Sequence, residues 1–220
     1  MDARAQKISQ TMKARRLDNF KRWRDEMKRQ GKIKSSYPAL QKNGDLAELI
    51  GTVLGDGHVY KHDRCDSLRI TGDAGKMGFV TRSTNLIETV FGKKPTICRV
   101  SASKAMTVTI YERLIAKRLG IPYGSRAALN YELPTWIARK RSFIARFLRG
   151  LYEAEGSLNY HSGTYTHKLV FSNTNPHLLN LVFRLLVRLG FHPHISGPRV
   201  QISRKAEVQD LKNLLEFRSY

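Results

Sequence analysis

The sequence is poor in cysteine and in acidic residues, and it contains no long apolar run. Its two cysteines, Cys65 and Cys98, have no companion cysteine or histidine at a zinc-binding spacing, and they indicate no disulfide framework. No apolar stretch approaches the about 20 residues that cross a bilayer, and no signal-peptide pattern follows the N-terminus. We therefore expect an intracellular protein, in the cytoplasm, the nucleoid or an organelle, with no membrane partner.

Acidic residues are scarce relative to basic ones. The chain has 39 Lys and Arg against 18 Asp and Glu, which gives a formal net charge of +21. Such an excess predicts a polyanionic partner, because Lys and Arg neutralise the phosphates that dominate non-specific nucleic-acid affinity. Charge alone fits a DNA-binding protein and a basic RNA-binding protein equally well.

A nine-residue pattern occurs twice, as LIGTVLGDG at residues 49–57 and as LRGLYEAEG at residues 148–156. In both copies the apolar residues follow helical spacing, and the pattern ends in an acidic residue followed by glycine. Gly156 is expected to take the left-handed conformation that closes a helix. The repetition predicts two related units, residues 45–132 and 133–220, after a basic helical extension and linker at residues 1–44.

Each copy also carries two small residues four positions apart. They are Gly51 and Gly55 in the first copy, and Gly150 and Ala154 in the second. Small residues at this spacing share one helix face and allow two helix backbones to approach closely. If these helices pack side by side, Asp56 and Glu155 come together at the same end.

Two carboxylates at helix C-termini call for a cation, because the helix end itself carries partial negative charge. Mg²⁺ is the simplest candidate, since it binds carboxylate and carbonyl oxygens. Either acid–glycine pair alone would also suit an ordinary helix-ending turn. Their recurrence at matching positions, Asp56 and Glu155, favours a functional role.

The segments between these patterns predict the fold. Strand-like runs occur at residues 58–61, 68–71, 96–100 and 106–110, and again at 157–160, 168–172, 194–196 and 199–203. Amphipathic helices separate and follow the pairs, so each unit reads helix, two strands, helix, two strands, helix. This order predicts an α+β fold with antiparallel sheets, each covered by helices on one side and free on the other.

Basic and polar residues alternate with apolar ones along the predicted strands. The candidates for contact with nucleic acid on the free faces are Arg69, Arg99, Lys168, Arg199, Gln201 and Arg204. A two-stranded ribbon fits the major groove of B-DNA, where such side chains read base edges or bind phosphates. An ordinary solvated sheet face is the alternative for each single residue.

The N-terminal segment combines basic residues with apolar residues at three- and four-residue steps, which predicts an amphipathic helix or helix pair ending near Gly31. We expect it to grip DNA beside the main site through Lys7, Lys13, Arg15 and Arg16. A charged helix packed on the core, or a helix for a membrane surface or a partner, is the alternative. The next helix is predicted to begin at Asp45 as N-cap, with Glu48 completing a capping box.

Both nine-residue patterns resemble the signature helix of the LAGLIDADG homing endonucleases, in the single-chain form with two motifs. Residues 133–137 (LPTWI) resemble the usual lead-in to the second motif. The first copy departs from the family pattern at Leu54, where an acidic residue often stands. The resemblance implies two pseudo-symmetric αββαββα units whose antiparallel sheets form a saddle over double-stranded DNA.

The resemblance also implies a chemistry. Asp56 and Glu155 would bind Mg²⁺ or another divalent ion such as Mn²⁺, assisted by the backbone carbonyls of Gly55 and Ala154. Arg126 stands in a Gly-x-Arg context that resembles the Gly-x-Lys of family members, and it is the candidate for stabilising charge. Arg in place of Lys argues against a role in proton transfer, because guanidinium does not deprotonate. Arg218 is the candidate for the second copy.

The sequence thus predicts a monomeric, site-specific endonuclease that hydrolyses both strands of a DNA target. The alternative is an intron maturase, or a DNA- or RNA-binding protein of the same fold, that does not cut. Thr71, Asp73 and Asn173 are candidates for organising water, although an ordinary cap or helix-entry role suits each of them. The pair His192 and His194 lacks a third ligand, so a surface role is expected.

Overall fold

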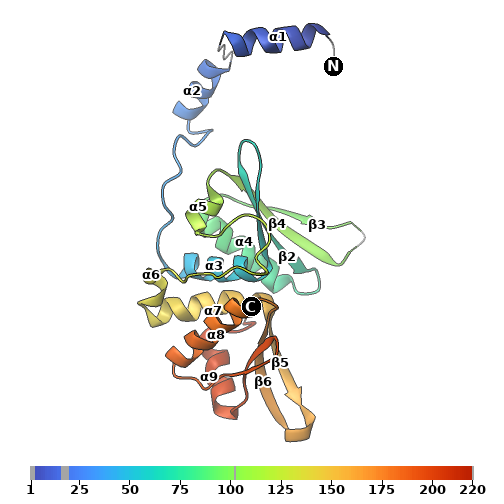
Figure 1. Ribbon diagram of the computed structural model, residues 1–220, viewed down its shortest axis with the longest axis vertical. Helices are drawn as coiled ribbons and strands as arrows, with labels where there is room; N and C mark the ends of the chain where they lie inside the picture. The colour runs from blue at the N-terminus through green and yellow to red at the C-terminus, as the bar shows by residue number, and fades with distance from the viewer. Residues whose placement is uncertain (1–2, 16–19, 102, 220) are drawn as a thin grey trace. The chain divides into compact units, whose positions relative to one another are not determined.

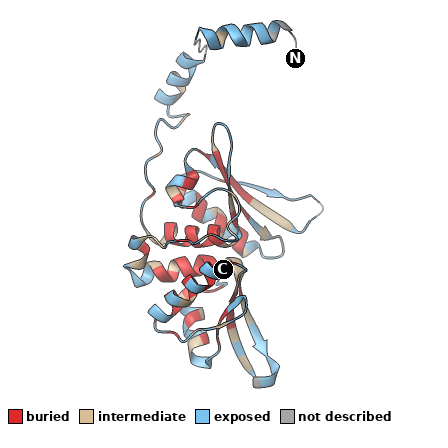
Figure 2. Cartoon of the chain, viewed as in Figure 1, coloured by how far each residue is buried: buried red, intermediate tan, exposed pale blue. Residues whose placement is uncertain are grey.

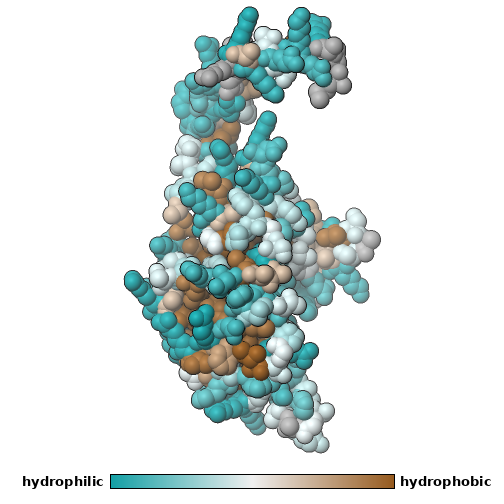
Figure 3. All heavy atoms as spheres, in the orientation of Figure 1, coloured by the Kyte–Doolittle hydropathy of each residue, from teal (hydrophilic) through white to brown (hydrophobic). Residues whose placement is uncertain are grey.

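The computed structural model describes residues 3–15, 20–101 and 103–219 (Figure 1). The chain divides into two compact units, residues 1–38 and 39–220. The first contains helices α1 (Ala3–Ala14) and α2 (Lys21–Arg29), and Gly31 follows with φ +70°. Their surface is mostly hydrophilic in Figure 3, and α2 has no buried residue. Within the described ranges no helix is long and apolar enough to span a membrane.

The unit of residues 39–220 contains both copies of the repeat in the same order of elements. The first copy consists of α3 (Gly44–Asp56), β1 (Gly57–Lys61), β2 (Asp66–Asp73), α4 (Met77–Phe91), β3 (Thr96–Arg99), β4 (Ala105–Glu112) and α5 (Ile115–Leu119). After a short helix α6 (Thr135–Ala138), the second consists of α7 (Arg141–Glu155), β5 (Gly156–His161), β6 (Thr166–Ser172), α8 (Pro176–Arg188), β7 (His194–Ser196), β8 (Arg199–Ile202) and α9 (Lys205–Leu215). A 3₁₀ turn, Ser162–Thr164, joins β5 to β6.

The two sheets have matching topology. Each has four antiparallel strands, in the orders β1-β2-β4-β3 and β5-β6-β8-β7. Helix α4 packs on β2 and β4, while α8 and α9 pack on the second sheet. Burial is concentrated between helices and sheets (Figure 2). The predicted α+β fold with two antiparallel sheets is confirmed.

Helices α3 and α7 form the centre of this unit and lie side by side between the sheets (Figure 1). Their close approach requires glycine, because a Cβ on Gly51 would collide with the carbonyl oxygen of Phe147. A Cβ on Gly150 would collide with the carbonyl oxygen of Glu48, and one on Gly55 would lie 2.5 Å from the Ala154 Cβ. The predicted packing of the two motif helices through small residues is confirmed.

The ends of these helices differ from expectation. Gly57 and Gly156 have φ −87°, so neither takes the left-handed conformation expected of Gly156. The chain passes directly from each helix into a strand, and the strand lies so close to the helix that a side chain does not fit. A Cβ on Gly57 would lie 2.5 Å from the Val53 Cα, and one on Gly156 would collide with the carbonyl oxygen of Tyr152.

The start of α3 also differs. Asn43, not Asp45, is the N-cap, and its side-chain oxygen accepts a hydrogen bond from the Leu46 N–H at 2.9 Å. Glu48 makes no capping box. Its side chain is 1% exposed and binds the guanidinium groups of Arg82 and Arg146. The predicted capping box is absent because the Glu48 carboxylate binds arginines from other helices instead of the helix N-terminus.

Candidate active site and nucleic-acid interface

Asp56 and Glu155 end helices α3 and α7 at the same end of the packed pair. The contact extends to their last turn, since a Cβ on Gly55 would lie 3.4 Å from the Glu155 Cγ. The expected juxtaposition of the two acids is therefore present. The small residues make this close approach of the two acids possible, because larger side chains would hold the helix ends apart.

Both carboxylates have raised pKa values. Desolvation, and after it the charge of Glu155, raises the pKa of Asp56 to about 7 against the opposing charges of Arg126 and Lys76. Desolvation also raises the pKa of Glu155, against a hydrogen bond from Asn173 Nδ2 to Glu155 Oε1 at 3.2 Å. Two acids that resist ionising side by side form a site that a cation would stabilise.

These donors suit a hard divalent ion. Carboxylate oxygens with adjacent backbone carbonyls are the ligands that Mg²⁺, Mn²⁺ and Ca²⁺ accept, and Mg²⁺ usually keeps several waters. Across the described part of the chain, no group of three or more His, Cys, Asp or Glu residues could hold a metal. A metal at this place would depend on Asp56 and Glu155, completed by carbonyl groups and water. His192, half of the histidine pair noted in the sequence, hydrogen-bonds to the Glu207 carboxylate.

An arginine accompanies each helix end. Arg126 donates from Nη2 to the carbonyl oxygen of Gly57, and its buried Nε and Nη1 have no hydrogen-bond partner. Arg218 donates from Nη2 to the carbonyl oxygen of Gly156 at 2.9 Å. Gly57 and Gly156 are matching positions of the repeat, so the two arginines are structural counterparts. Arg218, the candidate from the second copy, thus has the same backbone contact as Arg126.

Two cavities flank the helix ends. One is lined by Gly55, Arg126 and Asn173, and the other by Asp56, Lys76, Ala154 and Arg218. Thr71 and Asp73 also line the second cavity, and Asp73 Oδ1 accepts a hydrogen bond from the Gly75 N–H at 2.8 Å. Asp73 thus stabilises the turn between β2 and α4, whereas the cap position of α4 is Lys76.

Sequence reasoning missed two residues of this site. Lys76 follows β2 in a loop with no recognisable motif, and only the fold brings it near Asp56. Asn175 Nδ2 donates to the carbonyl oxygens of Arg126 and Leu129 at 2.9 and 2.8 Å, and so holds the loop that carries Arg126. The Asn-Pro pair that begins α8 could have identified Asn175 as a helix cap, but not this contact across the two copies.

The strand register assigns each predicted interface residue to a face, because directly paired residues share a side of the sheet. Arg69 pairs with Thr109 and Lys168 pairs with Asn159, both on the side away from the helices. Arg199 and Gln201 have the same orientation on β8, paired with Ser172 and Val170. These four residues face the open side, as expected. The Arg69 guanidinium carbon also lies 5.8 Å from the Tyr60 ring centroid.

The expected placement is wrong for two residues. Arg99 pairs with Met106, which shares its side of β4 with the buried Val108, so Arg99 is on the helix side. Arg204 lies beyond β8 at the start of α9, and its Nη1 donates to Glu207 Oε1 at 3.1 Å. Alternation showed that these were strand regions but did not give the register or the strand end.

The predicted N-terminal grip lies on the first unit. Lys7 and Lys13 are exposed on α1, and Arg15 is exposed directly after it. Arg16 lies outside the described residues. Contact of this segment with DNA stays a prediction.

Comparison with known proteins places the fold in a family. Residues 142–220 match the family model of the LAGLIDADG-like domain. A mesophilic variant of the homing endonuclease I-DmoI has a TM-score of 0.51 at 18% identity, over 78% of this chain and 94% of that chain. I-DmoI in complex with DNA and Mn has a TM-score of 0.50 at 18% identity, over 80% and 98%. The N-terminal LAGLIDADG domain of DUF199/WhiA has a TM-score of 0.55 at 16% identity, over 82% and 86%.

Similarity to curated sequences is confined to a segment. The replication factor C small subunit of Methanocaldococcus jannaschii is 30% identical over 135 residues, which is 54% of this chain and 7% of that protein. The tRNA-splicing ligase RtcB of Pyrococcus furiosus is 28% identical over 142 residues, which is 56% of this chain and 14% of that protein. The chain therefore spans only a small part of these relatives.

The family match thus covers the segment that contains the second motif helix and the second sheet. Residues 142–220 are similar to a LAGLIDADG-like domain, and residues 39–220 share the fold of I-DmoI and of the N-terminal LAGLIDADG domain of WhiA.

Proposed function

We propose that this protein is a site-specific endonuclease that hydrolyses both strands of a double-stranded DNA target with divalent metal ions. The observation that carries this proposal is the pairing of Asp56 and Glu155 at the joined ends of α3 and α7, beside two cavities that are each lined by one arginine. A helix pair needed only for folding would have no reason to bring two acids together where their ionisation is opposed.

Asp56 and Glu155, with the backbone carbonyls of Gly55 and Ala154, would hold Mg²⁺ or another divalent ion such as Mn²⁺. When bound, such ions lower the pKa of a coordinated water and stabilise charge on the phosphate. The relative I-DmoI has been solved in complex with DNA and Mn, and with DNA and Ca, which supports this choice of ion.

The basic residues have a separate task. Arg126 lines one of the two cavities, and its guanidinium charge would attract a phosphate there. Arg218 would act in the same way beside Gly156, and Lys76 adds a third positive charge near Asp56. None of the arginines can serve as a general base, so proton removal would depend on metal-bound water and its surroundings.

Binding of the target would use the open sheet faces. Arg69, Lys168, Arg199 and Gln201 are positioned to contact base edges or phosphates if the sheets enter the major groove as a saddle. The basic helices with Lys7, Lys13, Arg15 and Arg16 would add phosphate contacts beside that site. Since one chain supplies both motifs, we propose that the protein acts as a monomer inside the cell.

The distribution of relatives supports a homing role. The similar segment occupies a small part of two proteins whose names describe unrelated tasks, a replication factor and an RNA ligase. That pattern is expected of a mobile endonuclease domain, and it does not transfer either named activity to this chain.

The second candidate is a protein of the same fold that binds DNA or RNA without cutting, such as an intron maturase. Arg126 favours this non-cleaving candidate. A lysine at that position could exchange a proton during hydrolysis, whereas an arginine cannot.

The deciding experiment is incubation with a library of duplex targets and Mg²⁺, followed by sequencing of the ends. The proposal predicts double-strand breaks at one sequence that disappear with EDTA. Asp56→Asn and Glu155→Gln should abolish cutting while binding, measured in Ca²⁺, stays close to wild type. Tight binding of a selected duplex without any cutting in Mg²⁺ or Mn²⁺ would favour the non-cleaving candidate. A preference for RNA over every duplex would reject both DNA roles.

A further inference from the structure

We propose that Glu153 is a positioning residue that holds Arg218 in the second half of the candidate active site. The proposal rests on the function proposed above, in which Arg218 contacts the substrate. Glu153 lies on α7 two residues before Glu155, and its side chain is 6% exposed. Its Oε1 accepts a hydrogen bond from the backbone N–H of Arg218 at 2.6 Å, while the guanidinium of Arg218 reaches the Gly156 carbonyl oxygen.

Arg218 belongs to a C-terminal turn, residues 216–219, that needs to be held in place. Glu216 and Arg218 have φ of 45° and 51°, a left-handed conformation that is unfavourable for residues other than glycine. Such a backbone persists only where surrounding contacts fix it. The turn directly follows α9, and it ends next to the cavity lined by Asp56 and Ala154.

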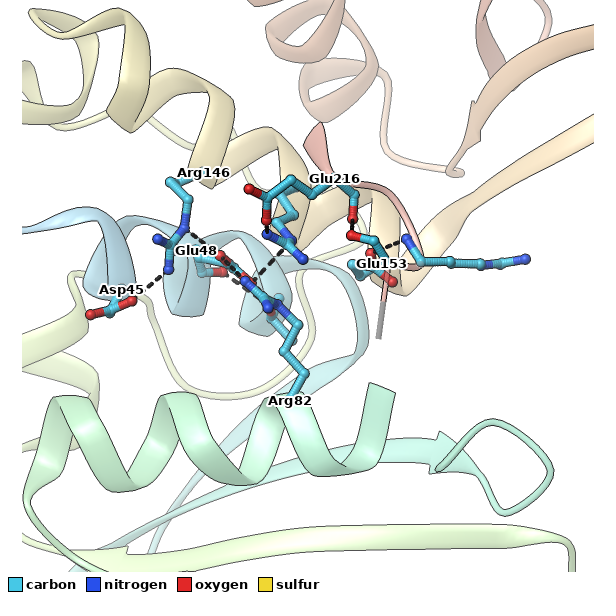
Figure 4. A network of polar contacts seen from close by, with 10 residues as sticks. Asp45, Glu48, Arg82, Arg146, Glu153 and Glu216 are labelled. Atoms are coloured by element: carbon cyan, nitrogen blue, oxygen red, sulfur yellow. Dashed lines mark hydrogen bonds and ion pairs between the residues drawn. The ribbon is translucent and has the colours of Figure 1, made fainter. Parts of the chain in front are cut away.

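Helix α7 supplies these contacts. Besides Glu153, the 4% exposed Arg149 forms an ion pair with Glu216, and Phe217 packs edge-on against Tyr152 with ring centroids 6.4 Å apart. Figure 4 shows Glu153 and Glu216 at one end of a charge network that continues to Glu48. The motif helix therefore holds both ends of the turn that delivers Arg218.

Among the described residues of the first copy, the corresponding arginine is held in a different way. The position in α3 that matches Glu153 is the buried Leu54, and the loop carrying Arg126 is held by Asn175 from the other half. The acidic residue of the second motif thus has a task that its counterpart in the first motif does not share. Because the first motif helix has a leucine, Leu54, at this position, Glu153→Leu should remove the contact with Arg218 and keep the helix.

The test measures cleavage of each strand separately in the full-length protein. A selected duplex is labelled on one strand at a time, and single-turnover rates are recorded in Mg²⁺. Glu153→Leu should slow the cutting of one strand by about 100-fold, the effect expected of a misplacement near 1 Å, and leave the other strand near the wild-type rate. Glu153→Gln keeps a carbonyl oxygen to accept the Arg218 N–H and should restore the rate.

Non-additivity separates positioning from general damage. Arg218→Ala should slow the same strand, and adding Glu153→Leu to it should change nothing further, because both changes remove one unit. Glu216→Ala, which removes the ion pair between the turn and Arg149, should slow that strand too. Equal slowing of both strands, or independent effects in the double variant, would overturn the proposal.

A second measurement does not depend on cleavage. In the full-length wild type and in Glu153→Gln, the Arg218 amide should be protected from hydrogen exchange, and in Glu153→Leu it should exchange faster. Unchanged protection in Glu153→Leu would overturn the positioning role. If Glu153→Leu loses this protection but the wild type cuts no duplex, the contact between Glu153 and Arg218 is supported and the endonuclease function is rejected.

Discussion

Replacing Asp56 with asparagine should stabilise the protein at pH 8 while removing its proposed metal ligand. Desolvation and the nearby Glu155 raise the pKa of Asp56 from 3.8 to about 7 in the folded protein. The folded state therefore favours the protonated acid. This contribution to stability is complete below pH 3.8 and is lost as the pH rises through 7.

The size of the effect follows from the same shift. A rise from 3.8 to about 7 corresponds to at most about 4 kcal/mol, since one pKa unit is about 1.4 kcal/mol. Asp56 is exposed to solvent, however, so water reduces both the desolvation and the repulsion from Glu155. We expect about 1 kcal/mol at pH 8, which would raise Tm by about 2–4 °C for a domain of this size.

The assay is urea or thermal unfolding of wild type and Asp56→Asn between pH 4 and pH 8, with EDTA present. The two proteins should be nearly equal at pH 4, and Asp56→Asn should become the more stable one as the pH rises. Asp63→Asn, at an exposed loop residue, is the matched control and should show no such trend. Ca²⁺ at pH 8 should then stabilise wild type but not Asp56→Asn, because only a folded site binds the ion. A variant that is equally or less stable than wild type at pH 8 would refute the reasoning.

Three further predictions concern folding and DNA affinity. Gly51→Ala should destabilise the protein by about 3 kcal/mol or more in urea unfolding, because its Cβ meets the backbone of α7, whereas Gly44→Ala, at ordinary contact distance, should have little effect. Glu48→Ala should lower the free energy of unfolding by about 3–5 kcal/mol, since it leaves three arginines without their shared buried carboxylate. Asp45→Ala, at the more exposed edge of the same network, should lower it by less than about 1 kcal/mol. Deleting residues 1–34 should weaken binding to duplex DNA and flatten its dependence on salt, and an unchanged salt slope would end the accessory-grip idea.

Local pattern was sufficient for the architecture. The repeated motif, with small residues four apart, predicted two helices in close contact that bring Asp56 and Glu155 together, and period-two alternation predicted the two sheets. These features depend on spacing within a single element, which the sequence carries directly. The boundaries of the predicted domains, and the contacts of the basic extension with DNA, stay predictions.

Tertiary structure decided the surroundings of the site. Arg99 faces the helix side because of the register between β3 and β4, and no residue within β3 carries that information. Glu48 left its predicted capping role because Arg82 and Arg146 reach it from distant segments. Glycine at positions 57 and 156 is required by close approach of a strand to a helix and not by a left-handed turn.

The amino-acid sequence by itself determined the paired motif helices, the acids that end them and the alternation of the strands, because each of these follows from neighbours along the chain. Only the folded chain decided that Arg126 and Arg218 occupy equivalent places at Gly57 and Gly156. It also decided that Asn175 and Glu153 hold these two arginines and that Lys76 lies near Asp56. Those contacts join residues that are far apart in sequence, and their geometry depends on register, helix packing and the shape of two loops.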